Sequence, residues 1–322
     1  MSASPVLQGE LAYEALRLAF IPWQRERRIA KEQERIRLAR FSSRVIATGR
    51  FHSLALRTDG RIACWGYNDF GEAPPAGVDG DFVAVAAGDL FSLALRCDGR
   101  IACWGCNNDD QAPPAGVDGD FVAIAAGGRH SLALRRDNSI ACWGYNNHGQ
   151  APPAGVDGDF VAIAAGGVHS IALRRDGNVA CWGWNLFGQA PPAGVDGDFV
   201  AIAAGHSYSL ALRRDGGITC WGQNNYGQAP PAGVDGDFVA IAAGHSHSLA
   251  LRRDGRIACW GYNDFGEAPP AGVDGDFVAI AAGHQHSLAL RHDGTIACWG
   301  RNNHNQAPPA GVAGPFGRNV DM

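Results

Sequence analysis

The chain has 322 residues, nine cysteines and a formal net charge of −5. A mildly acidic chain is not expected to bind nucleic acid directly, because phosphate contacts need clustered Lys and Arg. No apolar run reaches the roughly 18 residues of a transmembrane helix, and the N-terminus lacks the order of a secretory signal. We therefore expect neither a membrane span nor a signal peptide.

Residues 1–43 are expected to form a helical extension. One helix is predicted from Gln8 to Ile21 and a second from Trp23 to Phe41, which is rich in helix formers. Nine Arg or Lys and five Glu give residues 1–44 a charge of +4, which leaves −9 for residues 45–322. The basic segment is expected either to rest on the body of the protein as a solvated helix or to contact a partner or an anionic surface.

From Arg44 the sequence is a repeat with a period of 39 residues. Its markers are seven tryptophans at that interval: Trp65, Trp104, Trp143, Trp182, Trp221, Trp260 and Trp299. A fixed period of this length is typical of solenoids and propellers. The seven units together are long enough to bury a large common core.

Each unit contains three strand-like segments, which are FVAIAAG, SLALRR and RIACWG in Phe238 to Gly261. An Asp-Gly pair, such as Asp254-Gly255, separates the second segment from the third. This pair predicts a two-residue hairpin, because both residues tolerate positive φ. The remaining NxxGQAPPAGVDGD is predicted to be loop, since Pro-Pro cannot donate ladder hydrogen bonds. We predict three antiparallel strands per unit, with room for a short fourth.

The units are expected to close into a ring. The third segment is apolar on both faces, so its sheet must be covered on both sides. The end units keep the same apolar residues as the middle ones, whereas an open array needs polar caps. Seven units also suit a propeller. We predict an all-β, seven-bladed β-propeller at 44–314, a tail at 315–322, alanine-rich first segments at the axis and the tryptophans outside.

Seven of the nine cysteines occupy one repeat position: Cys64, Cys103, Cys142, Cys181, Cys220, Cys259 and Cys298. They are predicted to be buried free thiols that act as small apolar side chains. Reduced thiols suit an intracellular protein. We expect a cytoplasmic location, with the nucleus as the alternative.

The recurring pattern AAGxxHSLALRRDGxIxCWGxNxxGQ resembles the repeats of the regulator of chromosome condensation family over about residues 44–312. The short uniform unit is similar to bacterial members, including the propeller-type β-lactamase inhibitor protein. The resemblance implies a seven-bladed propeller, with three-stranded blades as in that inhibitor type. It also implies protein binding, usually through one end of the ring.

The sequence lacks the features that two known activities of this family require. Guanine nucleotide exchange in this family uses a wedge inserted in one blade, but every tryptophan interval here is 39. Ultraviolet-B perception in this fold uses a Gly-Trp-Arg-His-Thr sequence, which this chain lacks. The first hypothesis is a non-enzymatic protein-binding module. The alternatives are a regulator of a small GTPase or of chromatin, and a structural subunit that its N-terminal helices tether in a larger assembly.

The candidate partner-binding residues lie where the copies differ. The loop between the first and second segments and the loop after the third should open on one face, because the strands alternate in direction. The variable positions there carry aromatic, His and Arg side chains typical of interface hot spots. The predicted partner-binding residues are Phe51, Tyr67, Phe70, Leu90, Arg129, Tyr145, His148, Trp184, Phe187, Tyr226, Tyr262, Phe265, Arg301 and His304.

No catalytic residue, cofactor or metal site is predicted. His52, His130, His169, His247 and His286 share one position, but Phe91 and Tyr208 replace them in two repeats. We therefore expect packing or a backbone hydrogen bond rather than proton transfer. A metal ring of His206, His245 and His284 near the pore is the sharper alternative. The recurring VDGD sequence is expected to form a turn between blades rather than a calcium site.

Overall fold

The computed structural model describes residues 29–39, 41, 42 and 44–317. The first predicted helix, Gln8 to Ile21, lies outside these residues. Residues 29–39, 41, 42, 44 and 45 are helical, so the second helix runs past its predicted end at Phe41 and directly into the first strand. No helix of this described part is long and apolar enough to cross a membrane.

The remaining described residues form seven three-stranded antiparallel sheets, one per repeat. Blade 1 holds β1 (Ile46–Thr48), β2 (His52–Leu56) and β3 (Ile62–Gly66), and blade 2 holds β4 (Phe82–Ala87), β5 (Phe91–Arg96) and β6 (Ile101–Gly105). Blade 3 holds β7 (Phe121–Ala126), β8 (His130–Arg135) and β9 (Ile140–Gly144), and blade 4 holds β10 (Phe160–Ala165), β11 (His169–Arg174) and β12 (Val179–Gly183). Blade 5 holds β13 (Phe199–Ala204), β14 (Tyr208–Arg213) and β15 (Ile218–Gly222), and blade 6 holds β16 (Phe238–Ala243), β17 (His247–Arg252) and β18 (Ile257–Gly261). Blade 7 holds β19 (Phe277–Ala282), β20 (His286–Arg291) and β21 (Ile296–Gly300).

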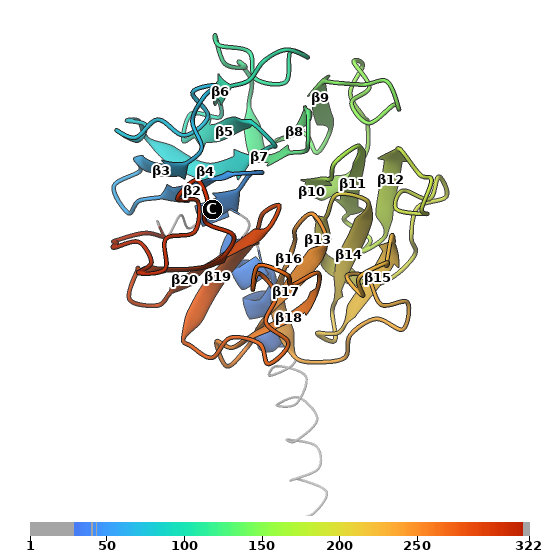
Figure 1. Cartoon of the computed structure of the whole chain (residues 1–322). Coiled ribbons are helices and arrows are strands. Elements are labelled where there is room, and N and C mark those ends of the chain that lie inside the picture. Colours follow the sequence, from blue (N-terminus) through green and yellow to red (C-terminus); the bar gives the residue numbers. More distant parts are fainter. Residues whose placement is uncertain (1–28, 40, 43, 318–322) are drawn as a thin grey trace, which may run out of the picture.

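The blades surround a central axis, which confirms the predicted seven-bladed propeller (Figure 1). The first strands of adjacent blades contact one another, so the alanine-rich segments line the axis. Each third strand carries one further bridge, as between Ile62 and Val78. A single bridging residue replaces the short fourth strand for which the sequence left room, because the Pro-Pro pair and a turn closed by the Gly77 amide and the Pro74 carbonyl directly precede it.

The hairpins between second and third strands differ in detail from the prediction. Gly60 has a φ of 85°, whereas Asp59 does not have positive φ. The amide of Gly60 donates to the Arg57 carbonyl, and the Asp59 carboxylate accepts from the Arg61 amide. The loop is therefore a tight turn followed by a left-handed residue. Asn138, with a φ of 70°, takes the glycine's place in blade 3.

The C-terminal segment closes the ring. Phe316 bridges to Arg57 at the end of β2, and the Gly317 amide donates to the Leu56 carbonyl. In blades 2 to 7 the same pairing joins the first residue of the inner strand to the second strand, as Phe82 pairs with Arg96. Arg57 lies 5.3 Å from the Phe316 ring centroid, as Arg96 lies 4.8 Å from that of Phe82. The sheet of blade 1 thus includes residues expected to belong to the tail.

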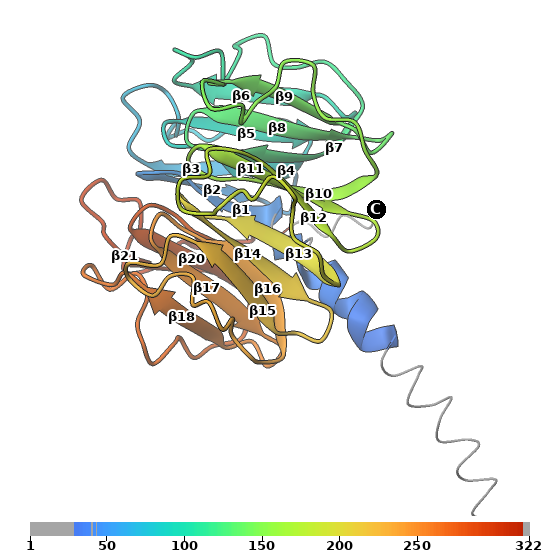
Figure 2. The same cartoon turned by 90° about the vertical axis from the view of Figure 1, so that its right-hand side faces the viewer.

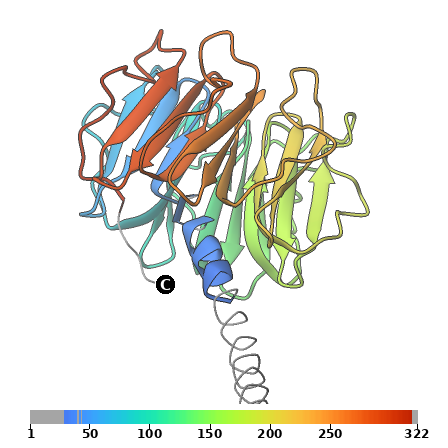
Figure 3. The same ribbon diagram turned by 90° about the horizontal axis from the view of Figure 1, so that it is seen from below.

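The N-terminal helix packs against the face that carries the Asp-Gly hairpins, called the hairpin face here. Figures 2 and 3 show it at one end of the ring, close to the axis. Arg35 is buried there, where Nε donates to the Phe238 carbonyl at 2.8 Å and the guanidinium contacts Asp237 at 2.6 Å. At the end of the helix the Ser42 hydroxyl accepts from the Ile280 amide at 2.9 Å. The helix rests on the propeller, one of the two predicted outcomes.

The cysteines of the repeat lie inside the blades as free thiols, as predicted. Six of the seven are buried, and Cys298 is half-buried. Burial raises the pKa of Cys64 and its equivalents to about 12. Such thiols remain protonated and act as apolar packing groups.

Candidate functional site

The two variable loops of each blade lie together at the end of the ring opposite the hairpins, on what we call the variable-loop face. In blade 1 the Tyr67 amide donates to the Phe51 carbonyl at 2.9 Å, which joins the loop after β3 to the loop after β1. The equivalent bond is present in every blade, down to Arg301 and Gln285 in blade 7 at 2.8 Å. The variable side chains therefore project from paired, hydrogen-bonded loops.

Each loop after a third strand is also held from within. The Asn68 side chain accepts the Ala73 amide at 2.7 Å, and the Glu72 carboxylate accepts the Phe70 amide at 3.0 Å. The same two bonds recur in the other blades with Asn and with Gln or Glu. These loops are rigid supports for the residues at their tips, which favours binding without a large ordering cost.

A continuous series of ring contacts, called the aromatic arc, spans blades 5, 6, 7 and 1. Tyr226 and Tyr262 lie 5.0 Å apart between ring centroids, and Tyr262 lies 6.5 Å from Phe265. The Arg301 guanidinium lies 5.3 Å from the Phe265 ring and 5.9 Å from the Phe51 ring. Phe51 then contacts Tyr67 and His304, which complete the arc. The structure thus brings seven predicted residues together.

A second, separate group covers blades 3 and 4. Arg129 lies 5.1 Å from the Tyr145 ring and forms an ion pair of 2.5 Å with Asp109. His148 stands between Tyr145 and Trp184, with a centroid distance of 4.4 Å to the tryptophan. Four further predicted residues therefore form a cluster of their own, apart from the aromatic arc.

The predicted residues differ in how exposed their side chains are. Phe70, Phe187, Tyr226 and Phe265 are between 43% and 55% exposed, whereas Leu90 is half-buried. Leu186 is 71% exposed and was missed by the sequence analysis. Its signal was present, because Leu186 is the only apolar residue at a repeat position that is otherwise Asp or Asn.

The shared histidine position belongs to a network between blades rather than to a reactive site. His52 is fully buried, and its Nε2 lies 3.0 Å from the Ser92 hydroxyl of the next blade. Ser92 donates to the Glu72 carbonyl at 2.9 Å, so its oxygen accepts from the histidine. Trp104 Nε1 donates to the same carbonyl. The predicted packing role is thus combined with a hydrogen bond to a serine side chain. The predicted backbone bond is present at the equivalent Tyr208, whose hydroxyl donates to the His247 carbonyl.

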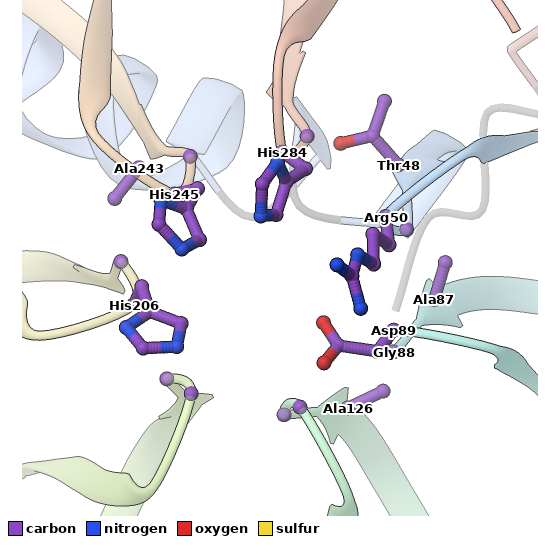
Figure 4. Close-up of a pocket in the computed structure, with 18 of the residues that line it drawn as sticks. Thr48, Arg50, Ala87, Gly88, Asp89, Ala126, His206, Ala243, His245 and His284 are labelled. Atoms are coloured by element: carbon purple, nitrogen blue, oxygen red, sulfur yellow. The ribbon is translucent and has the colours of Figure 1, made fainter. Parts of the chain in front are cut away.

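The axis opens on the variable-loop face in a cavity of about 80 Å³, called the axial pocket here (Figure 4). Seven equivalent positions form its mouth, one from each blade: Arg50, Asp89, Gly128, Gly167, His206, His245 and His284. The His245 ring lies 4.3 Å from that of His206 and 3.9 Å from that of His284. Adjacent rings are tilted by 38° and 43° to one another. The described residues include no group of three that could hold a metal ion.

The hairpin face has a different surface. It carries exposed Arg–Asp ion pairs, such as Arg136 with Asp120 and Arg175 with Asp159. In both pairs the Arg Nε lies within 3.0 Å of a carboxylate oxygen. In blade 5 the equivalent Arg214 also pairs with Glu32 of the helix, and in blade 6 Arg253 pairs with Glu34. The last aspartate of each of these VDGD sequences takes part in such a pair, and the chain bends at the preceding glycine.

The comparisons identify the repeat. The family model described as "Regulator of chromosome condensation (RCC1) repeat" matches residues 44–72, 82–111, 121–150, 160–189, 199–228, 238–267 and 277–306. No curated protein matches the chain in a sequence search.

Solved structures share the fold. Prp20p from Saccharomyces cerevisiae is 22% identical over 76% of this chain and 81% of its own, with a TM-score of 0.64. The CRINKLY WD40 ectodomain of the Arabidopsis thaliana receptor kinase ACR4 is 24% identical over 83% and 98%, with a TM-score of 0.67. Human WBSCR16 is 20% identical over 76% and 85%, with a TM-score of 0.65. At these identities the likeness concerns the fold alone.

Proposed function

Because this chain belongs to the regulator of chromosome condensation repeat family, we propose that it is a non-enzymatic protein-interaction module. We assign partner binding to the variable-loop face. The yeast relative Prp20p has been studied for its binding to Gsp1p and histones, and it has been crystallised with Kap60. Those partners belong to Prp20p, and they support the class of function rather than a particular partner.

The observation that carries the proposal is the aromatic arc. Tyr226 and Phe265 are about half exposed, although each is held by a rigid loop. Aromatic and Arg side chains dominate binding energy at protein interfaces because they bury large areas at little entropic cost. Hydrogen bonds to Asp69 and Asp264 raise the pKa of Tyr67 and Tyr262, so both phenols remain protonated donors.

The hairpin face supports the same choice by contrast. Its exposed Arg–Asp pairs offer little net binding energy in water. Part of that face is already covered by the N-terminal helix, whose Arg35 and Glu34 are paired with Asp237 and Arg253. These intramolecular contacts favour a helix that belongs to the propeller over one that tethers the chain elsewhere.

The test is capture from native extract with the full chain. The Tyr226→Ala, Tyr262→Ala, Phe265→Ala triple variant should lose the partner by at least about tenfold, because truncated hot-spot residues cost more than 1.4 kcal/mol. The control is Arg136→Ala, Arg175→Ala on the hairpin face, which should retain it. Capture that survives in the triple variant and fails in the control would overturn the proposal. Faster GDP release from a captured small GTPase would favour the exchange alternative.

A further inference from the structure

The backbone around the axial pocket is already hydrogen-bonded. The Arg50 amide donates to the Asp89 carbonyl at 3.2 Å, and the Asp89 amide donates to the Gly128 carbonyl at 3.3 Å. The amides of Gly128, Gly167 and His245 likewise donate to neighbouring blades. Five of the seven amides at the mouth are therefore already paired, so the side chains are the main groups left to recognise a ligand.

The side chains supply mainly donors. Figure 4 shows the Arg50 guanidinium and the imidazoles of His206, His245 and His284 projecting into the pocket, with the Asp89 carboxylate beside Arg50. The Nδ1 atoms of His206 and His245 lie 3.0 and 2.9 Å from the hydroxyls of the following serines. A hydroxyl that donates to Nδ1 leaves the imidazole proton on Nε2. The Nδ1 of His284 is buried and has no partner among the described residues.

The ionisable side chains of the pocket differ in how readily they carry charge. Burial lowers the pKa of His245 to about 3 and that of His284 to about 4, so both rings are neutral donors at pH 7. Arg50 is therefore the cation of the pocket. Burial raises the pKa of Asp89 to about 6 despite Arg50 and Arg129, so this carboxyl gains a proton easily.

Two of the seven mouth positions are glycines, which contribute no side chain. A Cβ at position 167 would fall 2.7 Å from Cδ2 of His206, and one at 128 would lie 2.7 Å from the Gly167 carbonyl oxygen. Both distances are too short for a side chain. The polar side chains at the mouth therefore come from the other five blades.

We propose that the axial pocket binds a carboxylate, with Arg50 as its charge partner and the three histidines as neutral donors. A planar carboxylate matches a guanidinium fork and fits a cavity of about 80 Å³. The aromatic arc borders the pocket on the same face, with the Phe51 ring 6.1 Å from that of His284. The carboxylate is therefore assigned to an acidic side chain of the bound protein. The assignment of the carboxylate to a bound protein rests on the proposed function, whereas the binding of a carboxylate by the pocket does not.

Asp89 makes the binding depend on pH. A bound carboxylate raises the pKa of Asp89 further, because like charges disfavour ionisation. Binding therefore takes up a proton above pH 6, and affinity should rise by up to about tenfold per pH unit as pH falls toward 6. The charged groups facing Asp89 are Arg50 and Arg129, and Arg129 is partly neutralised by Asp109.

The experiment is a titration of the full chain with sodium acetate at constant ionic strength, followed by NMR of the histidine ring protons. The resonances of His206, His245 and His284 should shift together. Arg50→Met should abolish the shift, and Asp89→Asn should tighten binding and remove most of its pH dependence. These opposite effects separate binding from a merely structural role, and circular dichroism checks that both variants fold.

A triglutamate peptide distinguishes the sources. Tighter binding of the peptide than of acetate, at equal carboxylate concentration, supports an acidic side chain of a protein. Equal binding of peptide and acetate would contradict a protein side chain as the source of the carboxylate and would indicate a small free anion instead. Histidine resonances that do not respond to acetate, or that respond equally in Arg50→Met, would overturn the pocket itself. Partner capture by the aromatic arc could still succeed in that case.

Discussion

At the scale of single residues, the tryptophan that marks the repeat is a hydrogen-bond donor between blades as well as a packing group. Trp65 of blade 1 donates to the Gln306 carbonyl of blade 7, and Ser53 donates to the same oxygen. His286 of blade 7 contacts Ser53 at 3.0 Å, so the network passes through the ring closure. Recurrence of the Trp, Ser and His positions thus has one physical cause, the junction between blades.

The chain contains a matched test of this junction. Ser92→Ala should lower the free energy of unfolding by about 1–3 kcal/mol more than Ser131→Ala, because it also leaves the buried His52 Nε2 without an acceptor. Ser131 faces Phe91, which cannot donate, and loses only its bond to Gln111. Urea denaturation of the two variants measures the difference. Equal losses would show that the histidine contributes by packing alone.

At the scale of elements, the N-terminal helix covers one end of the ring, and the variable loops occupy the other end. The helix uses Arg35, Glu32 and Glu34 to bind blades 5 and 6 and continues to the axis at Ser42. Arg44 extends further and donates to the Val122 carbonyl of blade 3. The hairpin end of the axis is therefore contacted by the chain's own helix, whereas the other end opens into the axial pocket.

Arg35 should anchor this helix. Arg35→Met removes charge-assisted hydrogen bonds to Asp237 and the Phe238 carbonyl, which are worth about 1.5–3 kcal/mol each in buried settings. Amides of residues 29–39 should then exchange with deuterium faster, while those of the blades remain protected. Arg37→Met is the control, because that side chain is exposed on the same helix. Similar exchange in both variants would contradict an anchoring role.

At the scale of the whole molecule, Phe316 joins the two ends of the repeat array. It is 3% exposed and packs with Ile46, Leu290 and Ile296, which belong to blades 1 and 7. The first repeat lacks the inner phenylalanine that begins the other inner strands, since its chain arrives from the helix instead. The C-terminal segment supplies that side chain and completes the core between the first and last blades.

Truncation tests the closure. A chain that ends at Gly314 should lose about 3–5 kcal/mol of unfolding free energy, as for deletion of a buried phenylalanine, and its melting temperature should fall. A chain that ends at Gly317 retains the pairing and should melt as the full chain does. Calorimetry of both truncations measures this. A closure segment without effect would mean that the apolar contacts between blades 1 and 7 suffice.

Acid should destabilise the propeller through its buried histidines. Burial lowers the pKa of His52, His169, His247 and His286 to about 3 and that of His130 to about 4. The unfolded chain binds a proton at each near pH 6.5, so stability is full above that pH. It falls by about 1.4 kcal/mol per pH unit for each histidine as pH drops toward the folded values.

His52→Phe isolates one of these protons, because Phe91 already occupies the same position in blade 2. The slope of unfolding free energy against pH between 6.5 and 5 should decrease by about 1.4 kcal/mol per unit. Urea titrations at several pH values provide the slope. An unchanged slope would mean that His52 binds its proton equally well in the folded protein.

The sequence by itself determined the architecture. The 39-residue period, the alternating segments and the Pro-Pro loops predicted seven three-stranded blades, because strand patterns are local and each copy repeats them. The two-residue hairpin was wrong in detail, since the Asp59 carboxylate accepts a nearby amide and holds Asp59 out of positive φ. The variable positions also indicated which residues gather on one face.

Only the tertiary structure decided how distant residues meet. Phe316 pairs with Arg57 across most of the chain, and Arg35 reaches Asp237 from a helix with no repeat of its own. The variable positions divide into the aromatic arc and a second cluster because side chains touch between adjacent blades, not along the sequence. Arg50, Asp89 and the three histidines form one pocket for the same reason. Ring closure brings equivalent positions, 39 residues apart, around a single axis.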